Sequence, residues 1–249
     1  GEVCDKVSTW AEEYLTGRIK KGRMTQEAVD AAKALFHVEK EMTKAVEGSD
    51  LIIEAIIENK SVKASVFREI DKLVNEDVII ATNSSYMLSS TFKDCVNNPA
   101  RLLNLHYYNP ALVMKLVEIM QGDHTGEEAV EACYDFCLRT GKTPIKIRKE
   151  LEGYAANRIL RVIVREARWM VANGYLTPQE ADIACENGLN HPMGPFRLND
   201  LTGIDLAFDI MKADYEKTGV KLDMYDEYEQ MVKEGRLGRK TGHGFYDYE

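Results

Sequence analysis

One segment of the sequence, residues 102–119, combines a histidine and a carboxylate in a pattern that suits proton transfer. Its first apolar run ends in His106, a turn at Asn109-Pro110 follows, and the second apolar run contains one acid, Glu118. Histidine has its ordinary pKa nearest neutral pH, and a carboxylate inside an apolar run needs a partner such as a polarised imidazole. A histidine at a strand end is more often a hydrogen-bonded structural residue. These two residues alone therefore leave a catalytic and a structural interpretation open.

The bulk properties of the chain narrow the classes of protein to consider. Its 249 residues, 45% hydrophobic and 29% charged, are typical of one large or two ordinary globular domains. A net charge of −9 disfavours nonspecific binding to nucleic acid. The longest apolar runs are too short to cross a membrane, and no charged-then-apolar leader opens the sequence. The 5 cysteines are scattered and do not complete a metal site, which favours free thiols in a reducing compartment. We expect a cytoplasmic protein without a bound metal.

The hydrophobic pattern divides the chain into two parts. In the first part, short β-branched runs alternate with amphipathic segments, which predicts an α/β fold with a parallel sheet and helices on both faces. Strands are predicted over residues 51–57, 78–82, 102–106, 115–120 and 143–147, and helices over 7–47 (broken near Gly22), 62–74 and 127–138. From residue 154 the pattern is helical, with a helix start at Thr177-Pro178-Gln179-Glu180. We therefore expect an α/β domain over residues 1–149 and an all-helical domain over residues 150–249.

Polar side chains follow three of the predicted strands where each strand ends. Glu58 follows the first strand, and Lys63 lies one turn into the next helix. Ser84 and Ser85 follow the second strand, and His106 ends the third. In open parallel sheets, ligands bind outside the carboxyl ends of the strands. Several polar groups that converge on one edge are less expected by chance than one, so this edge is predicted to hold a functional site.

Six motifs, in order along nearly the whole chain, resemble those of the 3-hydroxyacyl-CoA dehydrogenases. They are Asn83-Ser-Ser85, His106-Tyr-Tyr-Asn-Pro110, Val113-Met-Lys-Leu-Val-Glu118, Asn157-Arg-Ile-Leu160, His191-Pro-Met-Gly-Pro195 and Leu237-Gly-Arg-Lys-Thr-Gly-His-Gly-Phe-Tyr246. Six collinear motifs are far more specific than any single one. The resemblance implies a Rossmann-like sheet followed by an all-helical C-terminal domain, with NAD as cofactor. It also implies the oxidation of an L-3-hydroxyacyl-CoA to the 3-ketoacyl-CoA, or the reverse reduction.

The resemblance implies roles for individual residues near the reacting group. His106 matches the family's general base, and Glu118 matches the acid that orients the imidazole and stabilises its cation. Ser85 and Asn157 match residues that hydrogen-bond the reacting oxygen and position the substrate. From sequence alone, Asn157 could equally cap the helix that it begins.

Further contacts are implied for the cofactor and for coenzyme A. Cofactor contacts fall on Glu58, Lys63, Ser85, Asn109 and Lys240. Lys21 falls where a contact to the CoA phosphate would lie, and Lys240 could also be an ordinary tail lysine. The family habit implies a homodimer through residues 150–249, which would also contribute to the cleft for the acyl-CoA substrate.

The beginning of the sequence departs from the family pattern. The family begins with a strand, a Gly-x-Gly-x-x-Gly turn and a helix that hold the pyrophosphate, and this unit is absent here. The acid about 20 residues later, which would read the adenosine ribose, is absent too. The expectation that the cofactor is NAD rather than NADP therefore rests on the resemblance alone. Two explanations stay open: the chain is a fragment or processed form of a complete dehydrogenase, or it is a natural truncation.

Three functions follow as hypotheses. The first is the NAD-dependent dehydrogenase, which the sequence around His106 favours. The second is a truncated acyl-CoA-binding protein without redox activity, which the missing glycines favour. The third is a purely structural role, against which the intact set of catalytic-type residues argues.

Overall fold

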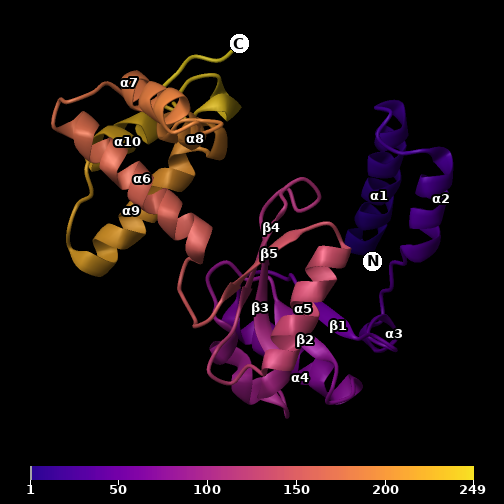
Figure 1. The fold of residues 1–249 in the computed structure, drawn as a ribbon. Coiled ribbons are helices and arrows are strands. Elements are labelled where there is room, and N and C mark those ends of the chain that lie inside the picture. Colours follow the sequence, from indigo (N-terminus) through magenta and orange to yellow (C-terminus); the bar gives the residue numbers. More distant parts are fainter. Residues whose placement is uncertain (1) are drawn as a thin grey trace. The chain divides into compact units, whose positions relative to one another are not determined.

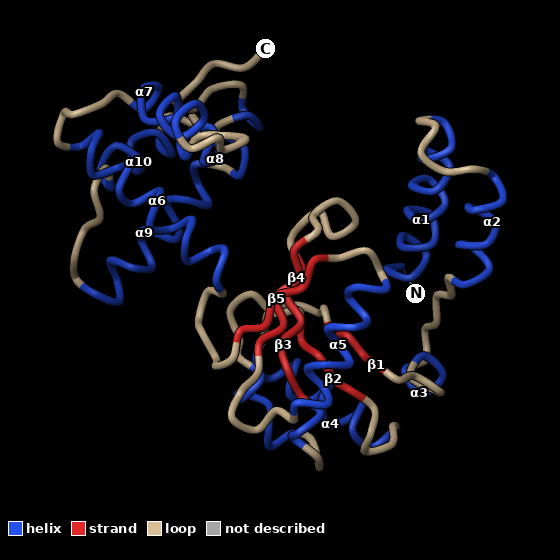
Figure 2. Tube along the Cα trace, in the orientation of Figure 1, coloured by secondary structure: helices blue, strands red, loops and turns tan. Residues whose placement is uncertain are grey.

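The computed structural model describes residues 2–249 and contains two compact units, one ending at Tyr154 and one spanning Ala155–Glu249 (Figure 1). The first unit holds a five-stranded sheet with helices around it. The second unit is helical: across residues 155–249, apart from isolated bridges, Figure 2 shows helices and loops but no strands.

The sheet has its strands in chain order, β1-β2-β3-β4-β5. They are β1 (Leu51–Glu54), β2 (Ile79–Thr82), β3 (Leu102–Tyr107), β4 (Leu116–Met120) and β5 (Thr143–Ile147). The neighbours β1 and β2, β2 and β3, and β4 and β5 are parallel, whereas β3 and β4 are antiparallel. The α/β fold class is confirmed, but the expected parallel order fails at this one pair. The reason is the connection, residues 108–115, because a parallel pair needs a crossover of about a dozen residues or more.

Both faces of the sheet are covered, as the continuous apolar runs predict. The helix α5 (Glu127–Arg139) packs on one face, against alternate residues such as Leu103 and Leu105 of β3. The helix α4 (Lys60–Leu73) and the 3₁₀ helix η1 (Ser89–Cys95) cover the opposite face, where Ile80 and Leu102 contact Phe67. Successive side chains of a strand point to opposite faces of the sheet. Leu103 and Leu105 face α5, so Asn104 and His106 point to the other face. His106 therefore belongs to the α4 side of the sheet.

Three helices precede the sheet: α1 (Glu2–Lys20), α2 (Gln26–Leu35) and α3 (Met42–Ala45). The predicted break near Gly22 is confirmed, since its φ of +63° is a conformation that glycine adopts without strain. Thr25 caps α2 by accepting a hydrogen bond from the amide of Ala28. An exposed ion pair between Lys33 and Glu12 joins α2 to α1 and contributes little stability.

The second unit contains five α-helices, α6 (Ala155–Ala172), α7 (Pro178–Ile183), α8 (Pro195–Thr202), α9 (Ile204–Thr218) and α10 (Tyr225–Lys233). The predicted start of α7 is confirmed in detail: Thr177 and Glu180 form a capping box, with Pro178 at the first helical position. The core of this unit is built from large buried side chains, namely Phe196, Ile204, Met211, Tyr228 and Met231.

Two buried carboxylates, Asp182 and Asp200, attach the C-terminal segment to the helices. Asp182 accepts a hydrogen bond from the hydroxyl of Tyr246 at 2.7 Å. Asp200 accepts hydrogen bonds from the amides of Phe245 (2.9 Å) and Tyr246 (3.0 Å) and from the hydroxyl of Tyr248 (2.9 Å). A Cβ on Gly244 would lie 2.1 Å from Asp200 Oδ1, so only glycine lets the chain approach this carboxylate. Gly244 thus serves the close packing of the tail.

We expect Asp200→Asn to lower the free energy of unfolding by about 1–3 kcal/mol, because the amide places a donor where the carboxylate accepted three hydrogen bonds. Urea unfolding measures the change. The matched control is Asp209→Asn on the exposed side of α9, which should stay within about 0.5 kcal/mol of the unchanged protein. Equal stabilities for the two variants would contradict the role given to Asp200.

Candidate active site

The antiparallel register of β3 and β4 places His106 directly opposite Glu118. The His106 Nδ1 atom lies 3.2 Å from Glu118 Oε2, and both side chains are buried. An ionised Glu118 carboxylate would only accept hydrogen bonds, which would place a proton on Nδ1 of the imidazole. The structure thus brings together the histidine and the acid that the sequence singled out.

The other ring nitrogen of His106 faces the turn after β2. Its Nε2 atom lies 3.0 Å from the hydroxyl oxygen of Ser85. With Nδ1 protonated, Nε2 is the acceptor and the Ser85 hydroxyl is the donor. Asn83 secures this turn to β3, since its side-chain oxygen accepts a hydrogen bond from the amide of Tyr107 at 2.8 Å. The Nε2 atom of the buried His106 thus faces a partly exposed hydroxyl group.

Two tyrosines that the sequence analysis missed surround the imidazole. The ring of Tyr154 stacks on His106 with centroids 4.0 Å apart, and Tyr108 approaches edge-on at 4.8 Å. The Tyr108 hydroxyl donates to Glu118 Oε2 at 2.6 Å, the same oxygen that His106 contacts. The only local sign of these contacts was the pair of tyrosines after His106. The stack with Tyr154 joins residues far apart in sequence and left no pattern.

Tyr154 is itself held in place through its hydroxyl group. It donates to the backbone oxygen of Ser84 at 2.5 Å and accepts from the side-chain amide of Asn104 at 2.9 Å. Burial raises the pKa of Tyr154, so the hydroxyl stays protonated at neutral pH and remains a donor. The aromatic wall beside the base is therefore connected both to β3 and to the turn after β2.

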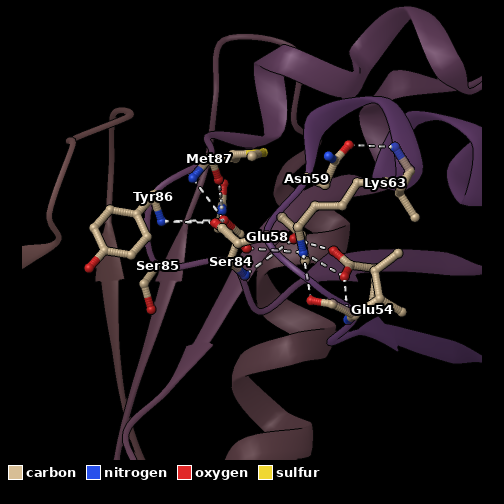
Figure 3. Close-up of polar contacts among 12 residues, drawn as sticks. Glu54, Glu58, Asn59, Lys63, Ser84, Ser85, Tyr86 and Met87 are labelled. Atoms are coloured by element: carbon tan, nitrogen blue, oxygen red, sulfur yellow. Dashed lines mark hydrogen bonds and ion pairs between the residues drawn. The ribbon is translucent and has the colours of Figure 1, made fainter.

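A cavity of about 260 Å³ lies beside this turn. The loop after β1 contributes Ala55, Ile56 and Glu58, α4 contributes Lys63, and the turn contributes residues 83–86. Figure 3 shows the side chains of Glu58, Lys63 and Ser84 converging here. The cavity thus joins the predicted cofactor residues Glu58 and Lys63 to Ser85.

Glu58 is the acidic group of this cavity. It accepts hydrogen bonds from the Ser84 hydroxyl and, at 3.4 Å, from the amide of Tyr86, and its carboxylate lies 3.2 Å from the Lys63 ammonium. Burial by itself would raise the pKa of Glu58, but the hydrogen bonds from Ser84 and Lys63 and the Lys63 charge outweigh it and lower that pKa. The ionised carboxylate is well placed to accept hydrogen bonds from hydroxyl or amide donors of a bound cofactor.

Four further predicted residues lie outside this constellation. Asn109 is exposed in the loop that follows β3, before the cis peptide bond to Pro110. Lys21 is exposed in the turn between α1 and α2. Asn157 lies inside α6, and Lys240 forms an ion pair with Asp205 in the same unit. Their proposed ligand contacts stay predictions.

Two negative findings concern the described residues 2–249. They contain no group of three or more His, Cys, Asp or Glu side chains arranged to hold a metal ion. None of their helices combines the length and the apolar content needed to span a bilayer.

Comparison with protein families identifies the chain. The model of the NAD binding domain of 3-hydroxyacyl-CoA dehydrogenase matches residues 2–151, and the model of the C-terminal domain of the same enzymes matches residues 153–248. The fold and the site therefore define an NAD-dependent oxidoreductase. The chain belongs to the 3-hydroxyacyl-CoA dehydrogenase family.

Individual relatives agree with this assignment. The chain is 34% identical to a 3-hydroxybutyryl-CoA dehydrogenase of Clostridioides difficile, over 99% of this chain and 87% of that protein. It is 30% identical to the mitochondrial hydroxyacyl-coenzyme A dehydrogenase of Mus musculus, over 100% of this chain and 81% of that protein. These relatives do not support the alternative of an acyl-CoA-binding protein without redox activity.

Solved structures give the same result. The (S)-3-hydroxybutyryl-CoA dehydrogenase of Ralstonia eutropha matches with a TM-score of 0.83 and 32% identity, covering 98% of this chain and 85% of that chain. The 3-hydroxybutyryl-CoA dehydrogenase of Escherichia coli matches with a TM-score of 0.89 and 28% identity, covering 100% of this chain and 52% of that chain.

We expect Ser84→Ala to raise the pKa of Glu58 toward its ordinary value of 4.5. A carboxylate whose pKa is lowered by folding stabilises the fold above its unfolded pKa, and this contribution disappears as the pH falls through the folded pKa. The variant should therefore lose up to about 1 kcal/mol at pH 7 relative to the unchanged protein, and the difference should shrink at a pH below 4.5.

Carbon-13 NMR titration of the Glu58 carboxylate and urea unfolding at the two pH values measure these effects. Ser90→Ala, at a partly buried serine of η1 that does not line the cavity, is the control and should leave the Glu58 titration unchanged. An unaltered Glu58 titration in Ser84→Ala would show that this hydrogen bond does not set the pKa.

Proposed function

We propose that this chain oxidises L-3-hydroxyacyl-CoA to 3-ketoacyl-CoA, and catalyses the reverse reduction, with His106 as the general base. The observation that carries the proposal is the orientation of the buried imidazole: Nδ1 faces Glu118 at 3.2 Å and Nε2 faces Ser85 at 3.0 Å. The basic nitrogen, Nε2, thus faces a position beside the cavity where the hydroxyl group of a substrate would bind. Bound NAD supplies the hydride acceptor of the reaction.

The residues around the imidazole support a proton transfer at Nε2. In the oxidation, His106 Nε2 takes the proton of the substrate hydroxyl and the imidazole becomes a cation. A buried cation is costly without a partner, and the Glu118 carboxylate opposite Nδ1 offsets this cost. In the reduction the same nitrogen returns the proton. Tyr154 and Tyr108 keep the ring plane fixed while its charge changes.

Ser85 marks the position of the reacting oxygen. Its hydroxyl can hydrogen-bond the substrate oxygen and so hold it near Nε2, which lowers the entropic part of the barrier. Asn157 in α6 is proposed as a second group that positions the substrate. Lys21 is proposed to contact the CoA phosphate, since its ammonium is exposed in a turn.

The residues of the cavity fit the polar, non-phosphate part of a nicotinamide dinucleotide. Glu58 offers an ionised acceptor, and Ser85 lies between the cavity and the base. Glu58, Lys63, Ser85, Asn109 and Lys240 are the residues proposed to hold NAD. The α/β unit would then be the cofactor domain, and the helical unit would supply the remaining substrate contacts.

The preferred substrate is proposed to be a short 3-hydroxyacyl-CoA such as 3-hydroxybutyryl-CoA. This rests on the names of the relatives, which include 3-hydroxybutyryl-CoA dehydrogenases from Clostridioides difficile and Ralstonia eutropha. The cytoplasm is the proposed location, which agrees with the 5 free cysteines.

A homodimer through the helical unit is also proposed. The helix α6 exposes large apolar side chains, among them Ile159, Val162 and Trp169. Exposed apolar surface of this kind marks association sites.

We expect His106→Gln to lower kcat about 10²–10⁴-fold, because glutamine keeps a polar side chain of similar size but cannot accept the proton. The assay is the reduction of acetoacetyl-CoA, followed by the loss of NADH absorbance. His37→Gln, at an exposed position, is the control and should keep full activity. A His106→Gln variant that folds normally and retains its kcat would exclude His106 as the base.

We expect the chain to sediment at twice its mass of 28.2 kDa. Val162→Asp on α6 should shift it to the monomer, because a dimer contact would bury the added carboxylate without a partner. Val220→Asp, at a similarly exposed position of the same unit, should leave the mass unchanged. A monomeric unchanged protein, or a dimeric Val162→Asp variant, would reject this interface.

A further inference from the structure

Glu54, the last residue of β1, lies at the centre of a polar group that the proposed mechanism does not use. Its Oε1 accepts hydrogen bonds from the Lys63 ammonium and from the amide of Ile56, each at 2.7 Å. Its Oε2 accepts a hydrogen bond from the Thr82 hydroxyl, also at 2.7 Å. The carboxylate thus connects β1, the loop after β1, α4 and the end of β2 (Figure 3).

These same elements form the walls of the cavity. Ile56 and Lys63 line it directly. Thr82 acts on the turn after β2, since its hydroxyl oxygen also accepts a hydrogen bond from the amide of Ser84 at 3.2 Å. One buried carboxylate therefore sets the spacing between the two loops that meet at the cavity.

Lys63 transmits this constraint to the acidic group of the cavity. The side chains of Glu54 and Lys63 are each only 1% exposed. The Lys63 ammonium has three protons, and it faces three acceptors: Glu54 at 2.7 Å, Glu58 at 3.2 Å and the backbone oxygen of Ile56 at 3.4 Å. Since every proton has an acceptor, the ammonium is held in one position, and Glu58 is held against it.

A requirement for stability alone does not explain this arrangement. Apolar side chains of similar volume are often as stabilising as a buried ion pair, or more so. A buried ion pair indicates a functional role where it also holds a third, partly exposed charge in place. Here that third charge is Glu58, which contacts Lys63 and whose side chain is 35% exposed.

We propose that Glu54 is a positioning residue of the cofactor site, which fixes Lys63 and thereby holds the Glu58 carboxylate in place for the donor groups of the nicotinamide dinucleotide. This inference rests on the proposed function. Glu54 touches no reacting atom, so its removal should weaken cofactor binding and leave the proton transfer at His106 intact.

The first test is Glu54→Gln, which keeps the size of the side chain and removes its charge. NADH fluorescence titration should show a Kd about tenfold higher, the effect of weakening one hydrogen bond to a charged group. In steady-state assays KM for NADH should rise by the same factor, while kcat stays within about threefold. An unchanged Kd and KM would overturn the proposal.

The chain offers a matched control in a second buried ion pair. Asp71, also on α4, pairs with Arg101, and that arginine contacts backbone oxygens of Asn75 and Val78 outside the residues that line the cavity. Asp71→Asn should lower the melting temperature. At temperatures below the melting temperature of the variant, the Kd for NADH should be unchanged. If Asp71→Asn weakens NADH binding as much as Glu54→Gln does, general loosening of the fold explains both and the proposal fails.

A double-mutant cycle tests whether Glu54 acts through Lys63. In a Lys63→Met background, adding Glu54→Gln should produce no further rise in the Kd for NADH. It should also recover part of the melting temperature, because it removes the carboxylate that Lys63→Met leaves buried without a partner. Independent, additive effects on the Kd would overturn the proposed route.

An unchanged chain that neither binds NADH nor reduces acetoacetyl-CoA would reject the proposed function and this inference together. Normal binding and turnover with an unaffected Glu54→Gln variant would reject this inference alone.

Discussion

The site depends on the antiparallel pairing of β3 and β4. Because the side chains of a strand alternate between faces, a slip of one residue would turn Glu118 away from His106. The short connection over residues 108–115 prevents a parallel crossover, and the buried apolar side chains of both strands secure the register. Hydrophobic packing between the strands thus fixes the separation between His106 and Glu118.

Two buried carboxylates organise the two halves of the site in a similar way. Glu118 orients the imidazole, and Glu54 holds the ammonium of Lys63. Each acid lies within a β-strand, where the backbone is already hydrogen-bonded and the side chain cannot reach solvent. Each acid can therefore stay charged only through its contacts with these partners. The same contacts hold the neighbouring groups in place. Rigid strands carry the charges, while the loops carry the groups that would meet the ligand.

The sequence predicted most of the elements and part of the site. Strand ends placed Ser85 and His106 together correctly, because carboxyl ends of parallel strands meet at one edge. The reasoning applied to Glu118, an acid inside an apolar run, would also have identified Glu54. The strand β1 ends at Glu54 rather than at the predicted residue 57. The contact of Tyr154 with His106 could not be foreseen, since a stack between distant residues leaves no periodic signal.

The stacking of Tyr154 on His106 also makes this histidine spectroscopically distinct. A ring whose centroid lies 4.0 Å from the imidazole and nearly parallel to it exposes the carbon-bound protons of His106 to a strong aromatic ring current. Among the 5 histidines of the chain, His106 is the one whose ring stacks on an aromatic ring in this way, within the described residues 2–249. Its proton resonances should be displaced upfield from the others, which makes the His106 ring a signal that can be followed without substrate or label.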